Sequence, residues 1–265
     1  MSALLKSIWN FRGFVFGSVK REFQAKYKNS ILGAVWTVLN PLAMIVVYTV
    51  IFSQIMKAKL PGVDSVYAYS IYLCAGVITW GLFAEIVGRS QNVFLDNANL
   101  LKKLSFPRIC LPIITVLNAY VNFSIVFALF LGFLIISGSF PGLVIFAAIP
   151  VLAIQSALAV GLGMVLGVLN VFFRDVGQFF GIFLQFWFWF TPVIYPIAIL
   201  PKELSEHLLV WNPMAPIIAA YQSIFVAQQQ PNWGTLIIPS ILSVLICLLG
   251  LRLFRKRAGE MVDEL

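Results

Sequence analysis

The chain has 265 residues and a formal net charge of +8, and 61% of its residues are hydrophobic while only 11% are charged. A soluble domain usually has about 25% charged residues, so this composition excludes an ordinary soluble enzyme. Disorder is excluded as well, because it requires low hydrophobicity and a high charge. The composition therefore indicates an integral membrane protein with most of its length in lipid.

The segment 1–33 precedes the long apolar stretches and is predicted to be a cytoplasmic amphipathic helix. Its apolar residues recur every three or four positions, at Ile8, Phe11, Val15, Val19 and Phe23. Basic residues fall largely between them, and this pattern is typical of a helix that lies in the membrane interface. A short helix packed on the protein's own bundle is the alternative interpretation.

Six apolar stretches are long enough for transmembrane helices, which need roughly 20 residues each. They lie at 34–56, 67–88, 109–136, 141–169, 176–199 and 235–254. The sequence therefore predicts an all-α polytopic membrane protein, with one transmembrane domain over 34–254 and a cytoplasmic tail over 255–265. A shorter apolar stretch at 214–227 is predicted to be re-entrant.

Lysine and arginine orient these helices. Fifteen of the 18 basic residues lie before the first stretch, in every second loop or in the C-terminal tail, and only three lie in the other loops. Because basic loops stay in the cytoplasm, both termini are predicted to be cytoplasmic. The positive charge is thus explained by topology and lipid contact, and nucleic-acid binding is not expected.

Residues that could act as acids, bases or metal ligands are scarce, and the sequence predicts no catalytic residue and no metal site. The sequence has no G-x-x-x-x-G-K-[ST] phosphate loop and no H-E-x-x-H motif, and His207 is its only histidine. Glu85 is the one acidic residue near the interior of a predicted span. It precedes Arg89 by four residues, a spacing that favours an ion pair, and a proton relay is the alternative.

The fifth apolar stretch is unusually rich in aromatic residues. Two interpretations stay open: packing against lipid, or a path on which sugars stack weakly on aromatic rings and slide. The residues predicted to line such a path are Trp36, Tyr48, Phe179, Phe183, Phe186, Trp187, Trp189, Phe190 and Tyr195.

Polar and small residues mark two other spans. Thr115, Asn118 and Asn122 form a polar line on the third, which indicates either hydrogen bonding between helices or a channel lining. Gly163 and Gly167 on the fourth have the spacing of close helix packing.

Two cytoplasmic segments are interpreted as docking surfaces. The first runs over 96–106, where Asp96 and the following Asn97 are suited to cap a short helix that carries Leu100, Leu101 and Leu104 on one side. The second is the tight turn over 170–175. Contact with the membrane surface is the alternative role for the leucines.

Five motifs in this order resemble those of one known family. They are K-Y-K-N-S-I-L-G-A-V-W at 26–36, L-S-F-P-R-I-C-L-P at 104–112, V-F-F-R-D-V at 171–176, T-P-V-I-Y at 191–195 and W-N-P-M at 211–214. Over nearly its whole length the chain resembles the membrane subunit of ABC-2-type polysaccharide exporters. That group includes the export permeases for O-antigen, capsular polysaccharide and teichoic acid.

The resemblance implies a homodimer that pairs with two copies of a separate ABC ATPase. ATP and Mg²⁺ would be used by the ATPase, so that this chain is not an enzyme and holds no cofactor. The substrate would be an undecaprenyl-diphosphate-linked polysaccharide, with O-antigen as the leading candidate, and the membrane would be a bacterial inner membrane. The residues assigned by resemblance to ATPase coupling are Asp96, Asn97, Asn99, Leu100, Leu101, Lys102, Lys103, Leu104, Arg174 and Asp175. Those assigned to the lipid head group are Arg21, Lys26 and Lys28. The resemblance also implies short external re-entrant helices over 201–227.

Two other functions compete with polysaccharide export. One is an ABC-2 permease for a lipid or a small drug, which the aromatic residues do not exclude. The other is a membrane-embedded polyprenyl-phosphate sugar transferase, which would need acidic residues or a metal site near the membrane surface. The few acidic residues of this chain are dispersed along it, which disfavours the transferase.

Overall fold

The computed structural model describes residues 9–26, 28, 33–55, 60, 65–103 and 106–264, in which helices and no strands occur. The elements in chain order are α2 (Arg12–Lys26), α3 (Trp36–Tyr48), α4 (Ala68–Ser90), α5 (Val93–Asp96), α6 (Ala98–Lys103), α7 (Cys110–Ile136), α8 (Ala148–Phe172), α9 (Asp175–Trp189), α10 (Lys202–Trp211), α11 (Met214–Gln222), α12 (Ile237–Arg257) and α13 (Glu260–Glu264).

Four of the described helices are long and apolar enough to cross a membrane. These are α4, α7, α8 together with the helical turn before it, and α12 with the turn before it. They coincide with the second, third, fourth and sixth predicted spans, so each of these four stretches forms a helix that is long and apolar enough to cross. The remaining two predicted spans are occupied by shorter helices, so the count of six is not reached on length and apolarity.

The first and fifth predicted spans differ from expectation in their extent. Helix α3 contains Pro41 and continues into a wider helical turn over Thr49–Ile55. Helix α9 ends at Trp189, ten residues before the predicted end at 199. Pro192 has no N–H to donate, and it disfavours the helical conformation of the residue before it, which explains why the helix ends early. At 15 residues α9 is about 22 Å long, against roughly 30 Å of hydrocarbon.

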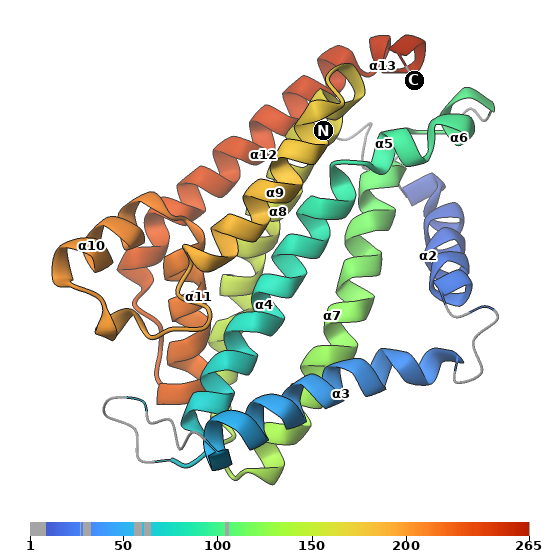
Figure 1. Cartoon of the computed structure of the whole chain (residues 1–265). Coiled ribbons are helices and arrows are strands. Elements are labelled where there is room, and N and C mark those ends of the chain that lie inside the picture. Colours follow the sequence, from blue (N-terminus) through green and yellow to red (C-terminus); the bar gives the residue numbers. More distant parts are fainter. Residues whose placement is uncertain are drawn as a thin grey trace.

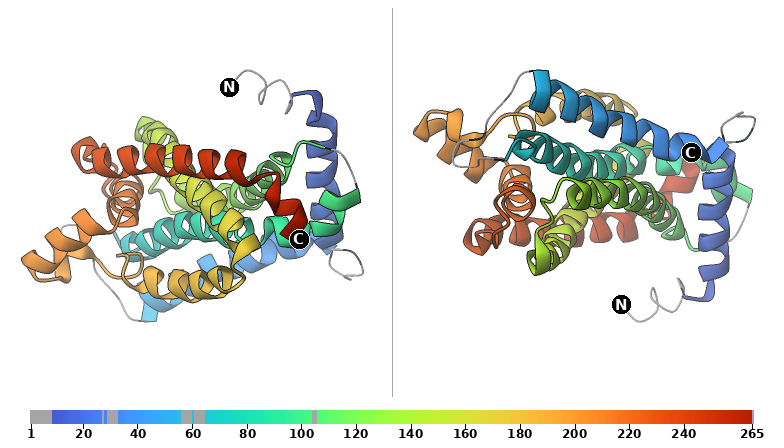
Figure 2. Two further views of the ribbon diagram at one scale, coloured as in Figure 1. Left: turned by 90° about the horizontal axis from the view of Figure 1, so that it is seen from above. Right: turned by 90° about the horizontal axis from the view of Figure 1, so that it is seen from below.

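The predicted external region forms two short helices. Helix α10 and helix α11, which continues to Ala227, meet at an angle of 108° across the break at 212–213. Such a bend is that of a broken span or a re-entrant loop. In the two views of Figure 2, α10 projects from the bundle on the side opposite α2.

Helix α4 is the centre of the bundle, and α3, α7, α8, α9 and α11 surround it (Figure 1). Its side chains Cys74, Phe83, Ile86 and Val87 are all fully buried. In lipid, helices associate through close packing and hydrogen bonds, because the surroundings are as apolar as the side chains. The central position of α4 therefore depends on the fit of its neighbours.

Glycines provide that fit between α4 and α8. A Cβ atom on Gly163 would lie 2.6 Å from the Cβ of Ser90, and one on Gly167 would lie 2.6 Å from the Ser90 carbonyl oxygen. Any side chain at these positions would push the two helices apart. The prediction that this glycine pair marks close helix packing is confirmed.

One end of the bundle gathers α5, α6, α13 and the turn between α8 and α9, with the start of α2 beside them (Figure 1). We call this the basic end, because the last turn of α12 leading to it carries Arg255, Lys256 and Arg257. Helix α2 packs along α7, with Val15 buried against Cys110 and Ile114. This contact matches the alternative interpretation, in which the N-terminal helix rests on its own bundle.

Candidate functional site

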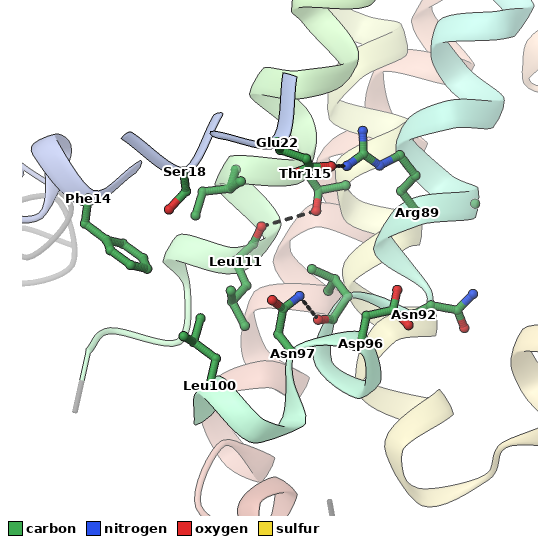
Figure 3. Close-up of a pocket in the computed structure, with 13 residues that line it drawn as sticks. Phe14, Ser18, Glu22, Arg89, Asn92, Asp96, Asn97, Leu100, Leu111 and Thr115 are labelled. Atoms are coloured by element: carbon green, nitrogen blue, oxygen red, sulfur yellow. Dashed lines mark hydrogen bonds and ion pairs between the residues drawn. The ribbon is translucent and has the colours of Figure 1, made fainter. Parts of the chain in front are cut away.

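A cavity of about 480 Å³ opens at the basic end, between α2, the end of α4, α5 and α7 (Figure 3). Arg89 is the one basic residue among the described residues that line it. The polar lining consists of Ser18, Glu22, Arg89, Asn92, Asp96, Asn97 and Thr115.

Carboxylates from two helices hold the guanidinium of Arg89. Its Nη2 pairs with Glu22 of α2, and its Nη1 donates to Oε1 of Glu85 at 3.4 Å. The local pair with Glu85 confirms the prediction made from their spacing. Glu22 was not predicted as a site residue. It is the only acidic residue among the first 63, and this isolation within a basic helix is the signal that would have pointed to it.

The polar line on α7 joins that helix to both partners of Arg89. Asn118 donates a hydrogen bond to Glu22, and Asn122 donates one to Glu85 at 2.6 Å. Thr115 donates instead to a carbonyl of its own helix, that of Leu111. Both asparagines thus form the hydrogen bonds between helices that the sequence suggests, while a role in lining a channel stays a prediction.

Two of the three cations assigned to the lipid head group, Arg21 and Lys28, are not among the described residues that line this cavity. Arg21 is exposed and donates to the hydroxyl of Ser18 at 2.9 Å, and Lys28 is exposed. The side chain of Lys26 lies outside the described part of the structure. The role of these residues at a head group stays a prediction.

The first docking segment contains the last residue of α5 and all of α6, followed by a stretch that includes Leu104 and lies outside the described residues. Asp96, Asn99 and Lys102 are exposed, Asn97 and Leu100 are half-buried, and the side chain of Lys103 is not among those described. Leu101, by contrast, is buried in a cluster with Phe94, Phe254 and Met261. The interpretation of Leu101 as an exposed docking residue is therefore wrong, because the C-terminal helix α13 covers it.

The second docking segment is the turn between α8 and α9. Arg174 and Asp175 are both exposed there. Asp175 is the first residue of α9, where a carboxylate interacts favourably with the positive end of the helix dipole. The two docking segments thus lie at the same end of the bundle, and each offers charged side chains (Figure 1).

Helix α9 presents one strongly exposed aromatic face. The exposed fractions of its aromatic side chains are 69% for Phe179, 41% for Phe183, 60% for Phe186, 63% for Trp189 and 63% for Phe190. The described part of the chain leaves these rings largely exposed on the outside of the bundle. The face is available to lipid, to substrate or to a second protein chain.

Trp187 belongs to the packing of the bundle. Its ring meets Trp80 and Phe83 of α4 edge-on, with centroids 6.1 and 5.3 Å apart. Its Nε1 donates to Oδ1 of Asn212 at 2.9 Å. The indole therefore fixes α9 to α4 and to the start of α11, so loss of Trp187 disturbs the fold as well as any path for sugars.

The T-P-V-I-Y segment after α9 is irregular, and side chains of other helices satisfy its carbonyl groups. The hydroxyl of Tyr72 lies 3.0 Å from the carbonyl oxygen of Pro192 and 2.8 Å from that of Tyr195, and Tyr69 donates to Ile194 at 3.0 Å. Gln222 adds a bond to Pro192 at 3.1 Å. A membrane protein must satisfy its irregular backbone internally, which explains these bonds. Sequence reasoning missed the donors.

The aromatic residues predicted on the first span stand differently. Trp36 is exposed at the start of α3, whereas Tyr48 is half-buried and packs edge-on against Phe52 at 6.2 Å. Tyr195 is also half-buried, and its hydroxyl donates to the carbonyl oxygen of Trp189. Contact of these residues with a substrate stays a prediction.

An apolar pocket of about 600 Å³ lies between α9 and α10. Aromatic walls come from both helices, and His207 of α10 is exposed at its edge. Among the described residues, no group of three histidine, cysteine, aspartate or glutamate side chains is arranged to hold a metal ion. The largely apolar, aromatic lining of the pocket is suited to flat apolar faces.

Comparison with known proteins identifies the family to which this chain belongs. Residues 15–226 match the family model of the ABC-2 type transporter. The chain is 29% identical over the full length of both proteins to the O-antigen export system permease protein RfbA of Myxococcus xanthus. It is 28% identical to the RfbA protein of Klebsiella pneumoniae, covering 89% of this chain and 88% of that protein, and 21% identical to the polysialic acid transport protein KpsM of Escherichia coli, covering 92% and 93%. The chain belongs to the ABC-2 type transporter family and is a multi-pass membrane protein.

Proposed function

We propose that the chain is the permease subunit of an ATP-driven ABC transporter that exports an undecaprenyl-diphosphate-linked polysaccharide across the inner membrane. O-antigen is the leading candidate for this polysaccharide. Relatives that are named for O-antigen export and for polysialic acid transport align with nearly the whole chain, which supports this substrate class.

The observation that carries the substrate class is the exposed aromatic face of α9. The rings extend from Phe179 to Phe190, and the aromatic pocket beside α10 continues them toward the external region. Flat rings bind the C–H faces of sugars without directional bonds. A polymer would therefore bind weakly at many positions and could slide along the face. The few exposed polar groups along this face favour sliding over tight binding.

The energy source would be a separate ATPase, because the sequence lacks a phosphate-binding loop of the G-x-x-x-x-G-K-[ST] type. Two copies of the ATPase would dock at the basic end of a homodimer. The exposed charged and polar groups for that contact are Asp96, Asn99 and Lys102 on α5–α6, and Arg174 and Asp175 at the turn between α8 and α9. Arg21, Lys26 and Lys28 would face the diphosphate of the arriving lipid.

The chain would cross the membrane six times, with α3 and α9 as the two short crossings and α10–α11 as the external re-entrant pair. Both termini would be cytoplasmic. The 108° bend between α10 and α11 supports re-entry, since a straight helix of their combined length would have crossed.

Reconstitution tests the function directly. The chain and its ATPase are placed together in vesicles that contain a polyprenyl-diphosphate-linked polysaccharide, and protection of the polymer from an external glycosidase is measured. We expect ATP-dependent protection that is lost with a hydrolysis-deficient ATPase. Transport by the chain alone would contradict the proposal. ATP-dependent movement of a lipid or drug but not of the polymer would favour the competing ABC-2 function.

A further inference from the structure

Asn170 near the end of α8 is buried and is fully engaged in hydrogen bonds. Its exposed fraction is 1%. Its Nδ2 lies 2.9 Å from the carbonyl oxygen of Gln91 and 2.9 Å from Oδ1 of Asn92, and its Oδ1 accepts from the backbone N–H of Gly177 at 2.8 Å. One side chain thus touches the corner between α4 and α5 and, on its other side, the first turn of α9.

Two of these partners are backbone groups at helix ends. The Gln91 carbonyl directly follows α4, and the Gly177 N–H is the third of α9, so each belongs to the set that a helix end leaves unsatisfied. A carboxamide supplies two donors and an acceptor at once, which a hydroxyl or a carboxylate cannot match in this arrangement. The Asn170 carboxamide therefore caps both the end of α4 and the start of α9.

The approach of α9 to this amide is close. A Cβ atom added to Gly177 would lie 2.7 Å from Nδ2 and 2.8 Å from Oδ1 of Asn170. There is consequently no room for a side chain at position 177 while the three hydrogen bonds persist. The contact is rigid because sterics and hydrogen bonds restrict the same groups.

The α4–α5 corner also connects to the cavity and to the docking segments. Asn92 lines the cavity at the basic end (Figure 3). Helix α5 begins directly after it, and α6 packs against α13, where Leu101 and Met261 are buried in one cluster. A displacement of α5–α6 therefore reaches Asn170 through short, packed connections.

We infer that Asn170 is a positioning residue that makes the α4–α5 corner and the start of α9 move as one unit, so that a displacement of α5–α6 is delivered to the aromatic helix. This inference rests on the proposed function, in which the ATPase docks on α5–α6 and the polymer meets α9. The bonded unit would convert force applied at two cytoplasmic segments into one movement of α9.

The test compares polymer exported with ATP hydrolysed in the reconstituted complex of permease and ATPase. Asn170→Ala removes all three bonds, and Gly177→Ala displaces the amide from the opposite side. We expect ATP hydrolysis to continue while the export per ATP falls by about two- to thirtyfold, the range that single positions in a coupling network produce. Asn92→Ala removes one bond only, and a smaller fall is expected.

Gln155→Ala is the matched control. Gln155 lies on the same helix, is equally buried, and donates to the Thr79 carbonyl of the same neighbour α4 at 2.7 Å. Loss of this bond lowers thermal stability without touching the α4–α5 corner, so export per ATP should stay at the wild-type value. A fall for Gln155→Ala equal to that for Asn170→Ala would reduce Asn170 to a merely structural role and overturn the inference.

The outcomes separate this inference from the proposed function. If the wild-type complex exports no polymer with ATP, the proposed function fails. If the wild type exports and folded Asn170→Ala and Gly177→Ala variants keep its export per ATP, the function stands and the inference is wrong. Should Asn170→Ala fail to fold, Asn92→Ala and Gly177→Ala decide the result alone.

Discussion

The ion pair of Glu22 with Arg89 shows how single residues fix the N-terminal helix to the bundle. The two side chains are 45% and 34% exposed, so water and salt weaken their attraction. The further bond from Asn118 gives the carboxylate a second anchor on α7. Together with the small apolar contact at Val15, these two polar contacts hold α2 in place.

Replacing Glu22 tests this attachment. Glu22→Gln should lower the free energy of unfolding by about 1 kcal/mol, because a partly exposed pair and one hydrogen bond are weakened. For a chain of this size that corresponds to a Tm lower by about 2–4 °C. Gln24→Ala on the exposed side of the same helix is the control and should leave Tm unchanged, as measured by thermal scans in detergent. An unchanged Tm for Glu22→Gln would show that the pair does not hold α2.

At the scale of elements, α9 and α6 show where sequence patterns mislead. The apolar stretch over 176–199 predicts one helix, yet Pro192 ends it early and the tyrosines of α4 hold the irregular segment that follows. The leucines of α6 predict an exposed docking face, yet Met261, 160 positions after Leu101, covers one of them. Neither contact has a local signature in the sequence.

Two tryptophans of α9 separate packing from transport. Trp187→Ala should destabilise the protein by about 3 kcal/mol, since its ring packs on α4 and its Nε1 bonds to Asn212. Trp189→Ala, at a position 63% exposed, should change stability by less than about 0.5 kcal/mol. We expect Trp189→Ala to reduce polymer export in the reconstituted assay. A fully active Trp189→Ala protein would contradict the role of this face in transport.

At the scale of the whole molecule, the arrangement separates two ends. The basic end gathers α5, α6, α13 and the turn before α9, while α10 lies on the opposite side of the bundle (Figures 1 and 2). This separation is what a transporter with an ATPase on one side and an exit on the other requires. The basic residues in the last turn of α12 predict that the basic end faces the cytoplasm.

Labelling of single cysteines tests that topology. We expect Glu203→Cys on α10 to react with a membrane-impermeant maleimide in intact spheroplasts, and Asn99→Cys and Gly259→Cys to react only after permeabilisation. All three positions are exposed, whereas Cys74 and Cys110 are buried and Cys247 is half-buried. Detergent-solubilised protein, in which all three variants should react, is the control. Labelling of Asn99→Cys in intact spheroplasts would invert the predicted orientation.

The sequence by itself determined the class of the protein, four of its spans, the local Glu85–Arg89 pair and the glycine packing, because each depends on composition or on residues within a few positions of one another. Only the tertiary structure decided that Glu22 reaches Arg89, that α13 covers Leu101 and that Asn170 joins α4 to α9. These contacts join residues that are distant in the chain or meet at helix ends. Their partners are chosen by the packing of whole helices, which no local pattern records.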